Sequence, residues 1–346
     1  MLNSYGWTPE RQHDFATYAV AGLIPARVTA QHRSGYRLIT QSGDVAGHLP
    51  ASCEPPATGD WLAVEPGQDL AVIRQRLPRS SAFVRRAAGA VREGQVVAAN
   101  IDVALLVASM NADFNLRRLE RYLAVAYESG ATPVIVLTKA DLAHDPQAFI
   151  GEAEAIAFGT PVIAVSAVTG HGYEALAQRV PVARTTVLLG SSGVGKSTVV
   201  NTLAGNPLMT TAPIREDDAR GRHTTTHRQL MLLPSGALIL DTPGMRELGL
   251  WDAETGLSAA FSEIETLAED CRFHDCRHGS EPGCAVQAAL ADGVLDAGRW
   301  RSYEKLQAEL AFERRKNDPR EASEHRRQWA SIHKAARQRM KIKYGD

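Results

Sequence analysis

A glycine-rich segment in the second half of the chain constrains the fold more than any other feature. GSSGVGKST at 190–198 fits the pattern G-x-x-x-x-G-K-[ST] and lies between an apolar run, TTVLL, and a helix-compatible run, TVVNTLA. Glycines let backbone N–H groups surround phosphate oxygens, the lysine neutralises the β- and γ-phosphates, and the hydroxyl after it coordinates Mg²⁺. The segment predicts a phosphate-binding loop before a helix N-terminus. Its nucleotide-contacting residues are expected to be Gly190, Ser191, Ser192, Gly193, Val194, Gly195, Lys196, Ser197 and Thr198.

Two downstream segments match the parts that surround Mg²⁺ and the terminal phosphate in such domains. DTPG follows the apolar run ALIL, so Asp241 is expected to hold Mg²⁺ directly or through water, and the Gly244 N–H to meet the γ-phosphate. The polar segment GRHTTTHR at 221–228 lies between the two phosphate motifs. We expect Thr225 to join Ser197 in the Mg²⁺ shell, with Thr224 as the alternative.

A base-recognition motif of the form [NT]-K-x-D also occurs, as TKAD after the apolar run TPVIVL. The Asp141 carboxylate can accept hydrogen bonds from guanine N1–H and from the exocyclic N2–H₂, and adenine offers neither donor. Thr138 begins the motif, and the stem of Lys139 is expected to lie over the base and ribose. Ser166 and Ala167, after the run PVIAV, match the short loop that touches guanine O6. The combination predicts guanine binding.

The order of these motifs is unusual. TKAD and Ser166–Ala167 precede the glycine-rich loop here, whereas in ordinary GTPases they follow the phosphate motifs. If each motif keeps its place in the sheet, the chain is circularly permuted, and the linker between Ala167 and Gly190 closes the old termini. Strand-like runs alternate with helical patterns from residue 100 onward. We therefore predict an α/β domain with a mostly parallel sheet and helices on both faces.

The N-terminal part has a different pattern. Five short strand-like runs in 26–77, ARVTAQ, YRLITQ, GDVAGHLP, GDWLAVEP and LAVIRQRLP, are separated by Gly, Pro and Asp. They favour a small β-barrel of the OB type, with a β-meander packed on the next domain as the alternative. We expect a helical or irregular lead-in at 1–25 and a basic connector at 78–99.

Three of the four cysteines fall within 14 residues, which favours a metal site over a disulfide framework. Cys271, Cys276, His278 and Cys284 form the pattern C-x4-C-x-H-x5-C. Three thiolates and an imidazole suit tetrahedral Zn²⁺, so we predict one structural Zn²⁺ per chain. His274 is a competing ligand, and reduced cysteines in a small helical domain are the alternative. Beyond residue 298 the pattern is helical, with an apolar stripe formed by Trp300, Tyr303, Leu306 and Leu310.

Composition and charge narrow the class of protein. Apolar residues make up 44% and charged residues 22%, as in soluble globular proteins. Neither a membrane-spanning run nor a signal peptide is recognisable, so we expect a cytoplasmic protein. The net charge is −1, yet 74–92 contains six arginines and no acid, and 326–346 contains seven basic residues against one acid. Such patches suggest a nucleic-acid partner, with solvated surface charge as the alternative.

The permuted motifs, the preceding barrel and the C-x4-C-x-H-x5-C cluster together resemble the RsgA family of circularly permuted GTPases of bacterial small-subunit biogenesis. The resemblance implies an OB-fold domain at 26–85, a permuted GTPase domain at 95–262, and a helical zinc-binding domain with a basic tail at 263–346. It also implies GTP hydrolysis stimulated by the 30S subunit, contacts with 16S rRNA, and release late in maturation. We expect a monomer that binds GTP and GDP.

Hydrolysis by the free protein is expected to be slow. Met245 occupies the position where Ras-type GTPases carry a water-orienting glutamine, and Gly193 stands where some potassium-stimulated GTPases carry asparagine. One hypothesis is that the ribosomal particle orders the loop around 215–228 and brings His223 or His227 to the water. The alternative is that both histidines contact only RNA or solvent.

Two other functions remain open from the sequence. One is a nucleotide-gated switch that binds RNA or protein elsewhere in the cell, with negligible turnover. The other is a P-loop ATPase or kinase, against which TKAD argues.

Overall fold

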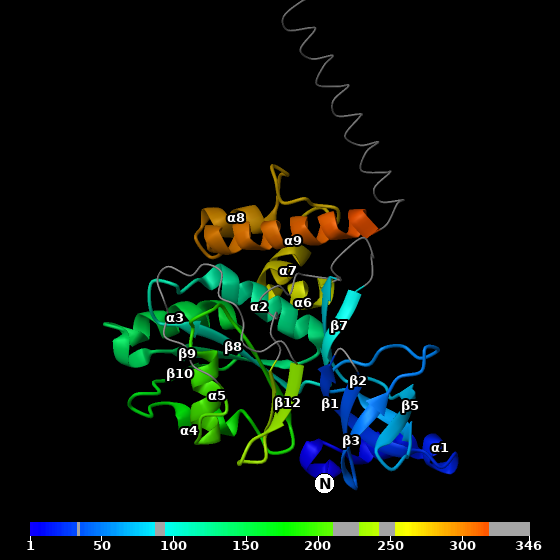
Figure 1. Cartoon of the computed structure of the whole chain (residues 1–346). Coiled ribbons are helices and arrows are strands. Elements are labelled where there is room, and N and C mark those ends of the chain that lie inside the picture. The colour runs from blue at the N-terminus through cyan, green and yellow to red at the C-terminus, as the bar shows by residue number, and fades with distance from the viewer. Residues whose placement is uncertain (33–34, 87–93, 210–227, 242–252, 318–346) are drawn as a thin grey trace, which may run out of the picture.

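The computed structural model describes residues 1–32, 35–86, 94–209, 228–241 and 253–317. A small β-barrel lies beside a larger α/β unit, and further helices lie over one face of that unit (Figure 1). The strands are β1 (Ile24–His32), β2 (Gly35–Thr40), β3 (Gly43–His48), β4 (Trp61–Glu65), β5 (Leu70–Arg76), β6 (Ala82–Arg86), β7 (Gly94–Ala99), β8 (Val103–Ser109), β9 (Thr132–Thr138), β10 (Val162–Ala164), β11 (Thr185–Leu189), β12 (Arg228–Leu232) and β13 (Leu238–Asp241). The helices are η1 (Leu2–Tyr5), α1 (Pro9–Val20), α2 (Leu116–Ser129), η2 (Ala140–Leu142), α3 (Pro146–Ala157), α4 (Tyr173–Gln178), α5 (Lys196–Ala204), α6 (Glu254–Ala260), α7 (Ser262–Glu269), α8 (Ala285–Ala291) and α9 (Ala297–Asn317). Within the described ranges, every helix is too short or too polar to cross a membrane.

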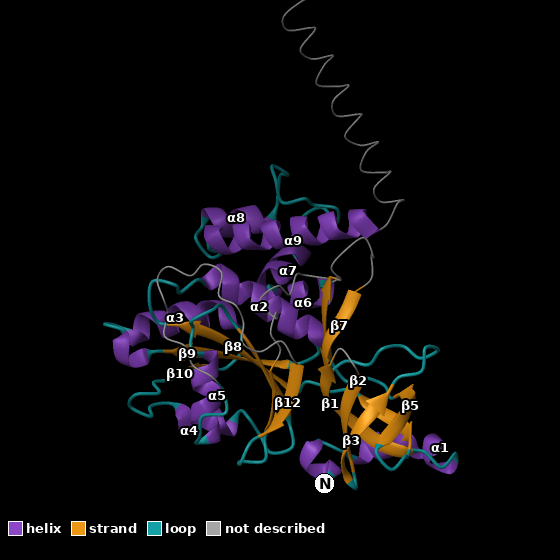
Figure 2. Ribbon diagram, viewed as in Figure 1, coloured by secondary structure: helices purple, strands orange, loops and turns teal. Residues whose placement is uncertain are grey.

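The α/β unit is built on six strands in the order β10-β9-β8-β11-β13-β12. Strands β8, β9, β10 and β12 of this sheet are labelled in Figure 2. Neighbours are parallel except β12 and β13, which are antiparallel. β8 is buried along its whole length, as its continuous apolar run requires in a sheet covered on both faces. The predicted mostly parallel sheet is confirmed.

Helices cover both faces of this sheet, also as predicted. On one face, Leu119 of α2 belongs to the same hydrophobic core as Leu106 of β8. On the other face, Leu176 of α4 and Val199 of α5 share a core with Leu105, the neighbour of Leu106 in the same strand. Successive residues of a strand point to opposite faces, so a run of apolar residues supplies both cores.

The α2 helix starts and ends at local sequence signals. Asn115 is its N-cap, because the Asn115 side chain accepts a hydrogen bond from the Arg118 N–H at 3.1 Å. Gly130 ends the helix with φ 82°, a conformation that glycine adopts without steric cost. Between these residues the helix packs on the sheet with one face and on the C-terminal helices with another (Figure 1).

The N-terminal barrel is closed. β1 pairs with both β2 and β4, β2 with β3, and β5 with both β3 and β4. The β3–β5 pair is parallel and the others are antiparallel. Since a meander pairs only consecutive strands, the β-meander alternative is excluded and the predicted five-stranded barrel is confirmed.

The barrel and the α/β sheet are continuous, which the sequence did not predict. β1 pairs with β12 through Ala30–Gln229 and Gln31–Arg228, so these strands join the barrel and the α/β strands in one 11-stranded sheet. Arg27, also in β1, is buried and donates to the Thr185 hydroxyl of β11 at 2.8 Å, which gives a second link between the barrel and the α/β unit. Burial lowers the pKa of its guanidinium to about 10, which leaves it protonated at neutral pH.

The lead-in and the connector both carry regular structure. In the lead-in, α1 begins after Thr8, whose hydroxyl accepts a hydrogen bond from the Arg11 N–H. Phe15 of this helix packs with Trp61 and Leu77 of the barrel region. The connector, expected to be a simple link, contains the hairpin β6–β7. This hairpin forms a sheet of its own, so the chain reaches the α/β sheet only at β8.

The C-terminal helices pack against α2. Glu128 of α2 accepts a hydrogen bond from the Gly256 N–H of α6 at 2.7 Å. Farther along the chain, α9 buries the apolar stripe that the sequence predicted, and all four of its residues are at most 8% exposed: Trp300, Tyr303, Leu306 and Leu310.

Candidate functional site

The glycine-rich loop lies at the carboxyl end of β11, between that strand and α5. A Cβ on Gly190 would lie 2.4 Å from the carbonyl oxygen of Val107, so only glycine fits this close to β8. Gly193 and Gly195 have φ of 74° and 97°, which side chains other than glycine rarely adopt. The helix begins at Lys196, directly after the loop. Its first N–H groups have no partner within the helix, and such groups suit a phosphate ligand.

Lys196 lies along the loop rather than away from it. Its Nζ donates to the carbonyl oxygens of Gly190 at 2.7 Å and Ser191 at 2.5 Å. The ammonium is therefore held beside the backbone that would surround a polyphosphate. Ser197 follows in the first turn of α5.

Thr138 connects the base-recognition motif to the phosphate motif. Its Oγ1 donates to the carbonyl oxygen of Val194, in the loop, at 2.5 Å. The contact joins residues 56 positions apart, because β9 and β11 are parallel strands of one sheet and end at the same edge. Thr138 therefore also holds the phosphate-binding loop in place. The TKAD motif alone does not predict this contact.

Asp141 and Ser166, the two predicted base-recognition positions, lie together. The Ser166 hydroxyl donates to Asp141 Oδ1 at 2.6 Å, and the Ala140 N–H donates to the carbonyl oxygen of Val165 at 3.2 Å. Lys139 has φ 62°, an unusual conformation that turns the chain sharply after β9. Asp141 is exposed, so its carboxylate is accessible to a ligand.

Asp241 is the last residue of β13, the strand next to β11. It therefore lies at the edge that carries the phosphate loop. Other predicted site residues lie outside the described ranges: His223, Thr224, Thr225, His227, Gly244 and Met245.

One contact at the loop was not predicted. Arg118, in the first turn of α2, donates to the Ser191 hydroxyl and pairs with Asp113 at 2.9 Å. In the sequence Arg118 is one of several arginines on a helix, and its partner Ser191 lies 73 positions away. A helical wheel gives no sign of such a contact.

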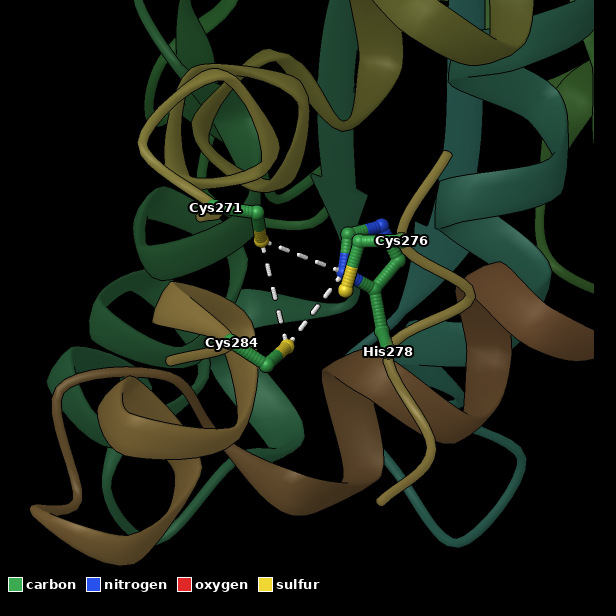
Figure 3. Close-up of side chains that lie close together, drawn as sticks. All are labelled: Cys271, Cys276, His278 and Cys284. Atoms are coloured by element: carbon green, nitrogen blue, oxygen red, sulfur yellow. Dashed lines mark hydrogen bonds between the residues drawn. The ribbon is translucent and has the colours of Figure 1, made fainter. Parts of the chain in front are cut away.

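The predicted metal cluster is assembled in the loop between α7 and α8 (Figure 3). The ligand atoms of its four residues all lie within 4.8 Å of one another: Cys271, Cys276, His278 and Cys284. The Sγ atoms of Cys271 and Cys284 are 3.9 Å apart, and each is 3.5 Å from His278 Nδ1. Tetrahedral Zn²⁺ with sulfur ligands at about 2.3 Å needs ligand atoms about 3.8 Å apart. The cluster therefore fits a metal ion, and His278 rather than His274 completes it.

The fold and these sites define a P-loop protein in which the base-recognition strands precede the phosphate-loop strand, with an N-terminal β-barrel and a metal-binding helical region. The model of the RsgA GTPase family matches residues 76–251. The "small ribosomal subunit biogenesis GTPase RsgA 1" of Listeria innocua is 46% identical over 99% of both chains. That of Streptomyces coelicolor, "small ribosomal subunit biogenesis GTPase RsgA", is 46% identical over 97% of this chain and 94% of its own.

Two solved structures share the architecture. YjeQ from Thermotoga maritima has a TM-score of 0.65 and 25% identity, covering 83% of this chain and 98% of that one. YloQ, described as a circularly permuted GTPase, has a TM-score of 0.60 and covers 83% and 95%; at 24% identity it supports the fold. The chain belongs to the RsgA GTPase family and is a GTP-hydrolysing enzyme. The resemblance and the fold class predicted from the sequence are confirmed.

Proposed function

We propose that this GTPase acts in late maturation of the bacterial 30S ribosomal subunit, which stimulates its hydrolysis of GTP. Its relatives carry the name of small ribosomal subunit biogenesis GTPases over nearly the whole chain. The observation that supports the nucleotide site best is the pair of contacts Thr138–Val194 and Ser166–Asp141. They bring the base-recognition and phosphate motifs to one edge of the sheet despite their permuted order.

Each motif residue has a proposed role in this site. Asp141 binds guanine N1–H and N2–H₂, and Lys196 neutralises the β- and γ-phosphates. Ser197 and Asp241, with Thr225 from the sequence before β12, would hold the Mg²⁺ that accompanies GTP and offsets charge on the phosphates. These residues bind and orient the phosphates, and positioning of this kind is the main contribution of a protein to phosphoryl transfer.

We assign the metal cluster to one structural Zn²⁺, because three thiolates and an imidazole are the donor set that this ion prefers. We also propose three functional units, the OB barrel at 26–85, the GTPase domain at 95–262 and the zinc-binding domain at 263–346. The barrel and the C-terminal domain would contact 16S rRNA, which favours basic surfaces such as the arginine-rich segment 74–92. The factor would act as a cytoplasmic monomer.

Two measurements test this proposal. In competition experiments GTP and GDP should displace a fluorescent guanine nucleotide, whereas ATP should not. The Lys196→Ala variant should bind neither GTP nor GDP. Sedimentation with purified 30S subunits should recover the protein with a non-hydrolysable GTP analogue more than with GDP. Equal displacement by ATP would contradict the base assignment, and equal sedimentation in both nucleotide states would contradict a nucleotide-controlled role on the subunit.

A further inference from the structure

Arg118 extends from the first turn of α2 to the glycine-rich loop. Its backbone position is fixed by the Asn115 cap, at 3.1 Å. Its guanidinium donates to Ser191 Oγ, and it lies 2.9 Å from Asp113 Oδ2 and 3.3 Å from Asp113 Oδ1. Asp113 therefore orients the guanidinium while the same group contacts the second residue of the loop.

Ser191 is the residue through which this contact reaches the phosphate site. Its hydroxyl accepts from Arg118, and its carbonyl oxygen accepts from Lys196 Nζ at 2.5 Å. On the other side of the loop, Thr138 donates to the carbonyl oxygen of Val194. The loop is thus held from two different elements, with Arg118 on the side that positions the lysine.

We propose that Arg118 is a positioning residue for the phosphate-binding loop, which fixes Ser191 and through it the ammonium of Lys196. The charge of Arg118 is largely offset by its ion pair with Asp113, so the residue acts through geometry rather than by attracting phosphate directly. Since Lys196 serves the β- and γ-phosphates, Arg118 should favour GDP and GTP over GMP. This inference rests on the nucleotide site proposed above.

The adjacent arginine provides a matched control. Successive residues of an α-helix point about 100° apart, and Arg117 turns away from the loop to contact Glu120 at 2.6 Å and Asp296 at 3.3 Å. Arg117→Met therefore removes the same kind of side chain from the same helical turn without touching Ser191.

The experiment measures the affinities of GDP, GTP and GMP by competition for wild type, Arg118→Met, Arg118→Lys, Ser191→Ala, the double variant Arg118→Met/Ser191→Ala, and Arg117→Met. Loss of a hydrogen bond to a charged donor should weaken GDP and GTP binding by about tenfold, with GMP unchanged. Ser191→Ala should lose as much affinity for GDP and GTP as Arg118→Met does. The double variant should lose no more affinity than either single variant. Arg118→Lys, which keeps one donor, should recover part of the loss, and Arg117→Met should bind as wild type does.

The outcomes separate this inference from the proposed site. If wild type binds no guanine nucleotide, the proposed site itself is wrong. If wild type binds and Arg118→Met binds equally well, or loses GMP as much as GDP, the positioning role is wrong. Additive losses in the double variant would also contradict it. Ser191→Ala removes a single oxygen from a loop, so unchanged GDP affinity in that variant overturns the inference even if Arg118→Met fails to fold.

Discussion

Replacing Arg27 by methionine should lower the free energy of unfolding by about 4 kcal/mol and loosen the barrel from the α/β sheet. The guanidinium is buried and donates to the carbonyl oxygens of Tyr5, Gly59 and Asn100 and to the Thr185 hydroxyl. Hydrogen bonds to a charged group contribute about 1.5–3 kcal/mol each, or about 6 kcal/mol for four at the low end. Hydrogen bonds that share one group are not additive, so we expect a net loss of about 4 kcal/mol rather than the full sum. Methionine keeps much of the side-chain volume, so little of the loss comes from a cavity.

The assay is urea unfolding at a fixed GDP concentration, followed by two probes. Tryptophan fluorescence includes the signal of Trp61, which lies 5.2 Å from the Arg27 guanidinium, together with that of four tryptophans elsewhere in the chain. Release of a fluorescent GDP analogue reports on the α/β unit. We expect the tryptophan transition to move to lower urea and to separate from nucleotide release. Arg37→Met, an exposed change on β2, should shift either transition by less than about 0.5 kcal/mol. A shift for Arg27→Met no larger than that of this control would refute the reasoning.

Three further predictions concern the nucleotide and metal sites. Asp141→Asn should weaken GTP binding by about 100-fold or more and improve xanthosine triphosphate, whose C2 carbonyl accepts from the new amide; unchanged GTP affinity rules out Asp141 as the base-binding residue. Elemental analysis should find one Zn²⁺ per chain, and Cys284→Ser should abolish it and lower the melting temperature of the C-terminal helices; metal-free wild type with intact reduced cysteines argues against the site. Single-turnover hydrolysis should be slow without 30S subunits and stimulated by them, and His223→Ala or His227→Ala should remove the stimulation. Fast hydrolysis by the free protein contradicts dependence on a partner, whereas stimulation that survives both substitutions excludes only the histidines.

The parts that the sequence predicted are those in which local chemistry leaves little choice. Gly190 cannot carry a side chain beside Val107, and Lys196 must follow the loop to reach phosphate, so both positions are recognisable from a short motif. The β8 strand is buried on both faces and therefore uniformly apolar. The metal cluster is recognisable for the same reason, since its ligands must be cysteine or histidine at short spacing.

The parts that the sequence did not predict depend on contacts between distant segments. Among the residues that the structure describes, the β1–β12 pairing involves two residue pairs, and it leaves no periodic signal in either strand. The β6–β7 hairpin was not predicted because β6 contains Arg85, in a stretch that was expected to be a basic connector. An arginine side chain suits an exposed strand as well as a loop, so the residue type does not distinguish the two. The Arg27 side chain is buried although arginine is usually exposed, because its hydrogen-bond partners come from four separate segments of the chain. In each case the stabilising partner lies too far along the chain for pattern analysis to find it.

The α2 helix gives the permuted arrangement a second connection between the nucleotide site and the metal-binding region. The first connection is along the chain, because the permuted order places the C-terminal segment directly after DTPG in the sequence. The second runs through side chains, because buried Glu120 of α2 pairs with buried Arg299 of α9 at 3.1 Å, and Arg121 pairs with Glu309. A buried ion pair is costly to break, since it leaves an uncompensated charge. We therefore expect a displacement of α9 to carry α2 with it, and α2 holds the phosphate loop through Arg118, one turn or less from Glu120 and Arg121.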